Sequence, residues 1–313
     1  MTKLLQNRIA ESKLAMPVVF AYSMGIWLVY GLLHEFYLAS FGCFAVAAIL
    51  MSQLNNINAL IRIYTRMVNC TFMVLTCCAC FLIPSVHMFI MEICFISAMI
   101  FLFFTYEDKE SVGYTFYAFL FYGLASTFYA QILFYLPLIW LFTATNLLSL
   151  SWRTWGASMI GFLTPYWFVA GALTLTGGDY TILIAHFARV ANIQMPFDFS
   201  VLSTSQMVFY AFLCGLSVLG IVHYIRKHHD DKIRIRLIYV LIIWTDVATA
   251  LFLAFQPQHF NCFIRIMIIT TAPLIAHFIA LTHTKVTNIA FCVLTGLTLL
   301  LTGYNLWMSL SPS

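Results

Sequence analysis

Three ionisable residues interrupt stretches that are otherwise apolar, and they are the first candidates for chemistry. Glu92 lies in FIMEICFI, Asp246 in LIIWTDVATALF and Arg265 in NCFIRIMIITTAP. A charge at the middle of a membrane helix costs on the order of 2.5–3.5 kcal/mol on insertion scales, so such a residue usually faces a cavity or a partner. Carboxylates can exchange protons, and an arginine can hold an anion. These three residues therefore predict a substrate- or proton-binding site.

A second group of ionisable residues lies in TGGDYTILIAHFARVANIQMPFDFS, residues 176–200, which also contains Asp198. Asp179 can cap a short helix that runs to about residue 192. His186 and Arg189 are three residues apart, so they share a face of that helix. Its apolar residues would let it lie in the membrane interface, and they are Ile182, Leu183, Phe187 and Val190. The segment is either a simple connector or the rim of a binding site. In the second case Asp179, His186 and Arg189 are the candidate substrate-binding residues.

The composition sets the fold class. Hydrophobic residues make up 63% of the 313 residues and charged residues 8%, against roughly 25% charged residues in soluble domains. The apolar runs are unbroken, whereas barrel strands would alternate. The sequence therefore predicts an all-α, polytopic transmembrane helical bundle, a single integral membrane domain over 1–313, with a retained first helix. About eleven spans are expected, near 16–33, 37–54, 69–84, 86–105, 113–130, 132–150, 156–175, 201–225, 237–255, 261–281 and 287–309.

The distribution of basic residues predicts the orientation. With the N-terminus in the cytoplasm and eleven spans, 13 of the 15 Lys and Arg residues fall on the cytoplasmic side. This is the bias of the positive-inside rule, so the prediction is N-in and C-out. The loop 226–236, RKHHDDKIRIR, is then a basic cytoplasmic loop that contacts lipid headgroups. The loop 176–200 is then extracytoplasmic, and the net charge of +4 does not indicate nucleic-acid binding.

The cysteines and the paired histidines do not predict a metal site. Nearly all nine cysteines fall within apolar runs, where free cysteine behaves as a small hydrophobic residue. His228, His229, Asp230 and Asp231 are adjacent, and this spacing matches no closed metal site. No motif for a cofactor or for cytosolic nucleotide chemistry is present. We expect no metal and no cofactor.

The depth of the ionisable residues predicts a polar cavity open to the outside. In the first outer loop, GLLHEFYLAS, His34 and Glu35 stand at the outer surface, and Glu92 and Arg265 are each about one turn below it. Asp246 is roughly 13 Å below the outer end of its helix. We expect Asp246 to pair with Arg265 of the next helix. We also expect Arg189 to point across the cavity toward Glu35, Glu92 or Arg265.

Residues 94–166 carry a resemblance to a known family. The stretch contains a span that ends in a short charged loop, two tightly joined aromatic-rich spans, and then WRTW and GFLTP. In these features it resembles an uncharacterised Bacteroidota family of multipass inner-membrane proteins with a domain of unknown function. The resemblance implies location in the bacterial inner membrane, and it assigns no activity or site residue.

The whole chain also has a weaker, fold-level similarity to C-type glycosyltransferases and polysaccharide polymerases, which use polyprenyl-phosphate-linked sugars. The similarity implies that Glu35, beside His34, is the base that activates an acceptor hydroxyl. It also implies that Arg189, with His186 or Arg265, holds the lipid phosphate. The first outer loop departs from that pattern, because those enzymes commonly carry an aspartate in a longer loop.

Two other function classes compete with the transferase. A membrane carrier or lipid flippase would use Glu92, Asp246 and Arg265 as a coupling site, although the chain shows no internal repeat. A non-catalytic subunit of an envelope complex would need none of these residues. Membrane lipids are the expected partners in each case.

Overall fold

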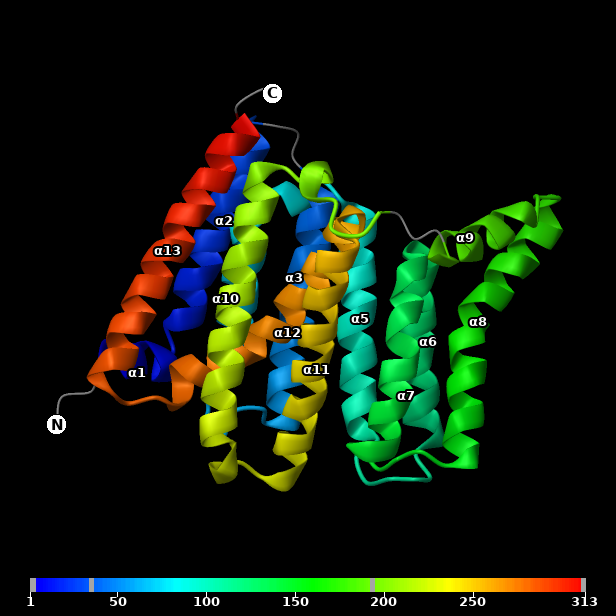
Figure 1. Ribbon diagram of the computed structural model, residues 1–313, viewed down its shortest axis with the longest axis horizontal. Coiled ribbons are helices and arrows are strands. Elements are labelled where there is room, and N and C mark those ends of the chain that lie inside the picture. Colours follow the sequence, from blue (N-terminus) through cyan, green and yellow to red (C-terminus); the bar gives the residue numbers. More distant parts are fainter. Residues whose placement is uncertain (1–3, 34–36, 192–194, 311–313) are drawn as a thin grey trace.

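The computed structural model describes residues 4–33, 37–191 and 195–310, and this part of the chain is helical without any strand (Figure 1). The α-helices are α1 (Leu5–Glu11), α2 (Ala15–Leu33), α3 (Leu38–Asn58), α4 (Met67–Cys78), α5 (Val86–Phe104), α6 (Val112–Phe128), α7 (Leu136–Thr145), α8 (Trp152–Thr176), α9 (Thr181–Ala191), α10 (Thr204–Lys227), α11 (Ile233–Phe255), α12 (Phe260–Leu281) and α13 (Lys285–Leu310). Short 3-10 helices join them: η1 (Cys80–Leu82), η2 (Ala130–Tyr135), η3 (Phe199–Val201), η4 (His228–Asp230) and η5 (Pro257–His259).

Eight of the described helices are long and apolar enough to cross a membrane, namely α2, α3, α5, α8, α10, α11, α12 and α13. The other three predicted spans coincide with shorter helices. α4 has 12 residues, α6 has 17 and α7 has 10. η1 follows α4 closely and η2 precedes α7 directly. The chain is therefore a multipass helical membrane protein, and the count of eleven spans remains a prediction.

The two ends of the bundle differ in character. At one end, which we call the basic end, lie α1 and the loops that follow α3, α5, α7 and α10 (Figure 1). Arg62 pairs there with Asp230 at 3.1 Å, and Arg234 donates to Asn58 at 3.0 Å. The opposite end, which we call the α9 end, holds α9 and the C-terminal end of α13 (Figure 1). This arrangement matches the predicted alternation of basic loops, and the N-in, C-out orientation remains a prediction.

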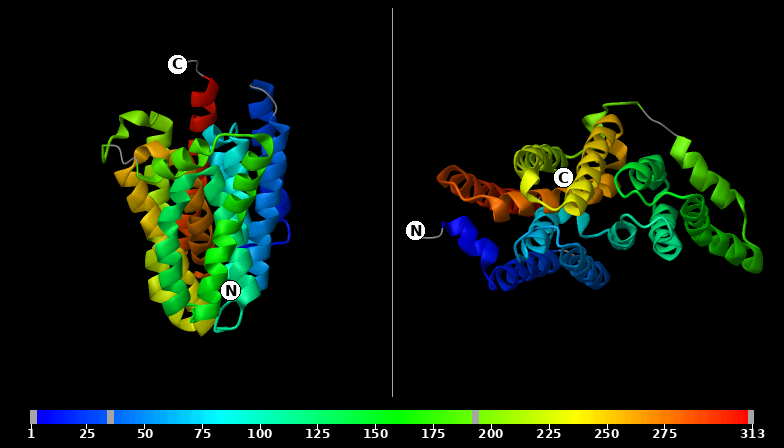
Figure 2. Two further views of the ribbon diagram at one scale, coloured as in Figure 1. Left: turned by 90° about the vertical axis from the view of Figure 1, so that its right-hand side faces the viewer. Right: turned by 90° about the horizontal axis from the view of Figure 1, so that it is seen from below.

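α12 is the centre of the bundle. All of its residues except Asn261 are buried, and it packs against α4, α10 and α11. α6, α7 and α8 lie together at one side of the molecule, and α1, α2 and α13 lie at the opposite side (Figure 2). Polar side chains on α12 are consequently enclosed by protein rather than lipid.

α9 forms where the sequence predicts it. Asp179 accepts hydrogen bonds from the hydroxyl and the backbone N–H of Thr181, at 2.6 and 2.8 Å. These bonds lower the pKa of the Asp179 carboxyl, with the Thr181 hydroxyl contributing most. The helix has no buried residue, as expected for a helix that lies along the membrane surface.

Candidate functional site

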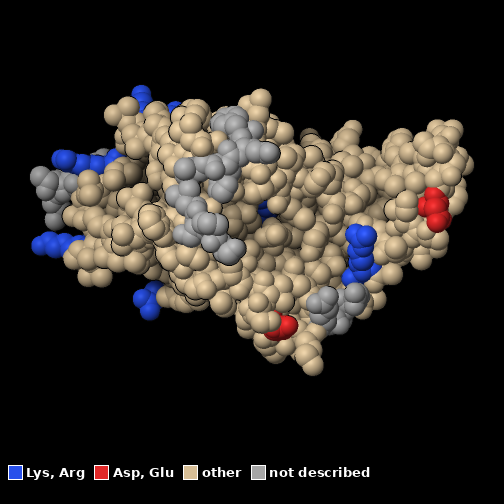
Figure 3. Space-filling model, turned by 90° about the horizontal axis from the view of Figure 1, so that it is seen from above, with Lys and Arg blue, Asp and Glu red and all other residues tan. Residues whose placement is uncertain are grey.

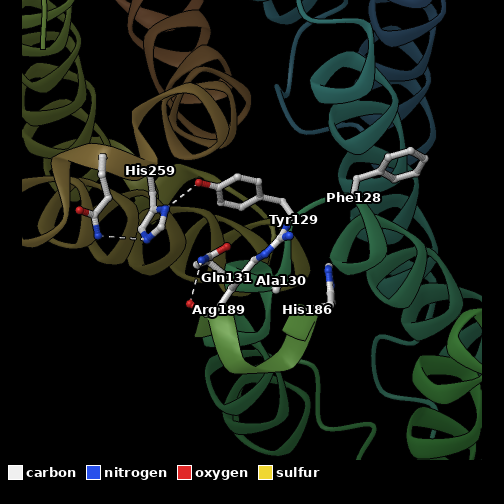
Figure 4. A pocket seen from close by; sticks show the side chains of 8 residues that line it. Phe128, Tyr129, Ala130, Gln131, His186, Arg189 and His259 are labelled. Atoms are coloured by element: carbon white, nitrogen blue, oxygen red, sulfur yellow. Dashed lines mark hydrogen bonds between the residues drawn. The ribbon is translucent and has the colours of Figure 1, made fainter. Parts of the chain in front are cut away.

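A polar pocket lies under α9, at the α9 end of the molecule. It has a volume of about 230 Å³, and Figure 4 shows the side chains that line it. α9 contributes His186 and Arg189, so the predicted shared face of these two residues is confirmed. The other lining residues come from the end of α6, from η2 and from η5: Phe128, Tyr129, Ala130, Gln131, Gln258 and His259.

Hydrogen bonds hold α9 over the pocket. The His186 Nε2–H donates to the carbonyl of Ser126 at 2.9 Å, and Gln131 Nε2 donates to the carbonyl of Arg189 at 3.2 Å. On the facing wall, Tyr129 Oη and His259 Nδ1 share a hydrogen bond of 2.6 Å. The walls are therefore fixed by their own contacts, which positions the remaining polar groups for a ligand.

The guanidinium of Arg189 is the charged group available to a ligand. Figure 4 shows its side chain directed from α9 toward Tyr129. Among the described residues no carboxylate pairs with it, since the ion pairs found there join other residues. A guanidinium can hold a phosphate or carboxylate through two parallel hydrogen bonds. The pocket is therefore suited to an anion.

An apolar pocket of about 410 Å³ lies beside the polar pocket, and we call the two pockets together the cleft. Its walls come from the η2–α7 segment, from α11 and from α12, and the lining residues are Phe134, Tyr135, Pro137, Leu138, Leu141, Ala248, Phe252 and Phe263. Phe252 contacts both His259 of the polar pocket, with ring centroids 6.0 Å apart, and Phe263 at 4.3 Å. The polar and apolar pockets are thus neighbours, separated by an aromatic layer.

Arg265 does not take part in either pocket. Its Nη1 contacts Glu92 Oε2 at 2.8 Å, its Nη2 donates to the carbonyl of Leu82 at 2.6 Å, and both charged side chains are 1% exposed. The guanidinium also lies 4.0 Å from the centroid of the Phe89 ring. Glu92 and Arg265 therefore form an enclosed ion pair that joins α5 to α12.

The predicted pair between Asp246 and Arg265 is wrong. Asp246 accepts hydrogen bonds from Thr270 at 2.7 Å, from Thr271 at 2.9 Å and from Ser217. Thr270 is five residues beyond Arg265 on α12, which places it roughly 7.5 Å further along the helix axis. Asp246 lies deeper in the bundle than Arg265, so its carboxylate contacts the hydroxyl groups of Ser217, Thr270 and Thr271 instead.

Arg189 was predicted to point toward Glu35, Glu92 or Arg265, and for Glu92 and Arg265 this prediction is wrong. Arg189 faces Tyr129 across the polar pocket, and the enclosed pair is not part of that pocket. The prediction for Glu35, and the role of His34 beside it, fall on residues 34–36, outside the described part of the chain.

The other acidic residues of the α9 end are not gathered into one cavity. Asp179 caps α9, and Asp198 accepts from the hydroxyl and the N–H of Ser200, which lowers the pKa of Asp198. Neither lines the polar pocket. Figure 3 looks onto this end and shows a largely uncharged surface with a few separate charges. Of the predicted site residues that the structure describes, only His186 and Arg189 line the polar pocket, so these residues do not form the expected single cavity.

Sequence reasoning missed Tyr129, Gln131, Gln258 and His259. The run QPQH at 256–259 was a signal, because two amides and a histidine between two apolar helices can line a polar site. Tyr129 and Gln131 gave no signal, since they lie within an aromatic-rich stretch that reads as two joined spans. Among the described residues, no three His, Cys, Asp or Glu side chains are grouped as metal ligands.

The fold and the site define a multipass helical membrane protein with neighbouring polar and apolar pockets. No protein-family model, no curated protein and no solved structure matches the chain.

Proposed function

We propose that the protein binds an anionic amphiphile in this cleft, with the phosphate held by Arg189 and the hydrocarbon chain in the apolar pocket. The substrate class is a polyprenyl-phosphate-linked sugar, and the setting is a bacterial inner membrane with the α9 end outside. The observation that carries the proposal is that the apolar pocket adjoins the polar pocket, where the Arg189 guanidinium has no carboxylate partner among the described residues.

The pocket offers the phosphate more than one favourable group. Arg189 supplies the charge, and His186 lies one turn before it on the same face. His259 also lines the pocket, and α12 begins at the next residue. The N-terminal end of a helix dipole is positive and favours an anion.

The reaction we propose is transfer of the sugar to an acceptor hydroxyl. The acceptor oxygen forms a bond to the sugar carbon, and the bond from that carbon to the oxygen of the lipid phosphate breaks. The lipid phosphate is the leaving group, and Arg189 holds it as its negative charge increases. A base must take the hydroxyl proton from within hydrogen-bond reach. His186 and His259 are the described pocket residues that can do so, and Glu35 is the candidate base from the sequence.

A lipid carrier or flippase is the second candidate. It would use the same cleft and leave the lipid chemically unchanged. The observation in its favour is Asp246, a carboxylate buried in the middle of α11 without a basic partner among the described residues. Ionisable groups at this depth often belong to transport or proton-transfer pathways.

Binding of polyprenyl phosphate, compared with the matching neutral polyprenol, tests the proposal. Native mass spectrometry of the purified protein would give both affinities for the wild type and for Arg189→Ala, Arg189→Lys and Arg153→Ala. Arg153 is an exposed arginine at the basic end, 3.7 Å from Glu110, and serves as the matched control.

The wild type and Arg153→Ala should both prefer the phosphate. Arg189→Ala should weaken phosphate binding by roughly 10- to 100-fold, the value of a charge-assisted hydrogen bond, and Arg189→Lys should lie in between. Equal affinity of the wild type for phosphate and alcohol, or an Arg189→Ala protein that binds like Arg153→Ala, would contradict the proposal.

A further inference from the structure

A second polar system lies inside the bundle, near the basic end. His277 of α12 and Asp231, which lies just before α11, are 3.0 Å apart, with side chains 0% and 1% exposed. The ring of His223 on α10 lies 5.3 Å from the ring of His277. Asp231 is therefore not the solvated loop residue that the sequence of 226–236 predicts, because it turns into the bundle.

Three buried atoms of this cluster have no hydrogen-bond partner in the part of the chain that the structure describes: His223 Nε2, Asp231 Oδ1 and His277 Nδ1. A buried polar atom without a partner is costly and uncommon. Three such atoms in one cluster indicate a site that exchanges a proton or holds a water. The titratable groups that face the cluster from neighbouring positions are Tyr224, Tyr239 and Lys227.

Asp246 is the second member of the system. Its carboxylate is fully buried and accepts from hydroxyls of two neighbouring helices, α10 and α12. Cys214 and Tyr135 are the titratable side chains near it. The hydroxyl shell can serve both forms of the acid, because a hydroxyl donates to a carboxylate and accepts from a protonated carboxyl.

Tyr239 lies between Asp246 and the histidine cluster. Its ring contacts the ring of His277 at 5.2 Å, and its hydroxyl donates to the carbonyl of Pro273 at 3.4 Å. Pro273 stands on α12 between Thr270 and His277. Those two residues are two turns apart, on one face of the helix and roughly 10.5 Å apart along it.

Hydroxyl groups also lie between Asp246 and the cleft. Thr249 lies one turn beyond Asp246 on α11, and its hydroxyl shares a hydrogen bond of 2.6 Å with Tyr135. Tyr135 lines the apolar pocket. Groups that can bind or donate a proton therefore occur at intervals from the cleft, past Asp246, to the basic end.

We infer that Asp246 is a proton-binding site and that Tyr239 and the His277–Asp231 pair relay its proton to the basic end. In uptake, a proton enters at the histidine cluster, the Tyr239 hydroxyl accepts it and releases its own, and the Asp246 carboxylate becomes a carboxyl. Release reverses these steps, and no electron moves. The inference goes beyond the binding of a lipid and stands whether or not a lipid binds.

Infrared difference spectroscopy tests the proton site directly. Protein in lipid vesicles, labelled with side-chain ¹³C-aspartate, would be recorded over a range of pH. We expect an isotope-shifted band of a protonated aspartate that disappears in Asp246→Asn and persists in Asp231→Asn. The label assigns the band to aspartate in the wild type, even where a variant does not fold. Absence of an aspartate band, or loss of the band only in Asp231→Asn, would overturn the inference.

The relay is tested by kinetics in vesicles whose basic end faces the bath and whose interior is buffered at high pH. After a drop in bath pH, Tyr239→Phe should protonate Asp246 roughly 100-fold more slowly than the wild type, at the lower end of what a positioned proton-transfer group contributes. Tyr224→Phe is the matched control, because the Tyr224 ring stacks on Tyr239 with centroids 4.6 Å apart but its hydroxyl donates to the backbone carbonyl of Arg236. His277→Gln tests the same relay should Tyr239→Phe not fold. Equal rates in the wild type, Tyr239→Phe and His277→Gln, or equal slowing in the two Tyr→Phe variants, would overturn the relay.

Discussion

The buried charges of this protein are satisfied in two different ways. Arg265 and Glu92 neutralise each other, with Leu82 and Phe89 completing the contacts of the guanidinium. Asp246 has only hydroxyl donors among the described residues. The pair therefore serves to hold α5 against α12, whereas Asp246 keeps the freedom to change its protonation state.

A double-mutant cycle separates the two arrangements. Glu92→Gln or Arg265→Gln alone leaves a buried unpaired charge and should cost roughly 3–5 kcal/mol of unfolding free energy. The double variant should lose clearly less than the sum. Asp246→Asn combined with Arg265→Gln should instead be additive within roughly 0.5 kcal/mol, because the two residues share no partner. Unfolding in mixed micelles measures both cycles, and additive losses for Glu92 with Arg265 would refute the ion pair.

The charged partners could be predicted from the sequence only in part. The sequence places Glu92 and Arg265 at similar depths, each about one turn inside the predicted outer end of its helix, and this equal depth favours the pair that forms. The sequence does not show which helices are neighbours across the bundle. Asp246 and Arg265 are close in the chain, but their depths differ, so their adjacency in sequence was misleading.

At the scale of helices, α6 and α8 approach each other through glycine. A Cβ on Gly161 of α8 would lie 2.5 Å from the carbonyl oxygen of Phe116, and one on Gly123 of α6 would lie 2.4 Å from that of Phe162. Small residues allow membrane helices to pack this closely. α8 in turn carries α9 at its far end, so this contact supports the segment that closes the polar pocket.

Gly161→Ala should destabilise the protein by roughly 1–3 kcal/mol, because the backbones must separate to admit the methyl group. Gly156→Ala on the same helix is the matched control. A Cβ there would meet nothing within 4 Å, and alanine favours a helix over glycine by roughly 1 kcal/mol. Thermal unfolding measures both variants. A Gly161→Ala protein as stable as Gly156→Ala would rule out the close contact.

Most helices could be predicted from apolar run length, and the exceptions have local causes. Pro137 falls in the first turn of α7, and the residues before it form η2 rather than the start of a span. α4 ends at Cys78 and gives way to η1 before Pro84. A prediction of spans from hydrophobic composition treats a 3-10 helix and the neighbouring α-helix as one span, because composition does not distinguish the two helix types. Here the change matters, since η2 supplies walls to both pockets.

At the scale of the whole molecule, the sequence predicted a polar site at the end that carries α9. The polar pocket lies there, and His186 and Arg189 line it. The apolar pocket below it could not be predicted, because its residues come from η2, α7, α11 and α12 and resemble any lipid-facing residues in composition. The site depends on how those elements are arranged around the cleft.

The most direct test of the central claim is photo-crosslinking with a polyprenyl phosphate that carries a diazirine in its chain, followed by peptide mapping. We predict labelling concentrated in the segments 134–141 and 248–252, which line the apolar pocket. The labelling should be competed by unlabelled polyprenyl phosphate but not by polyprenol, and it should fall sharply in Arg189→Ala. Labelling spread evenly over lipid-exposed helices such as α8 and α13, and unchanged in Arg189→Ala, would contradict the proposed site.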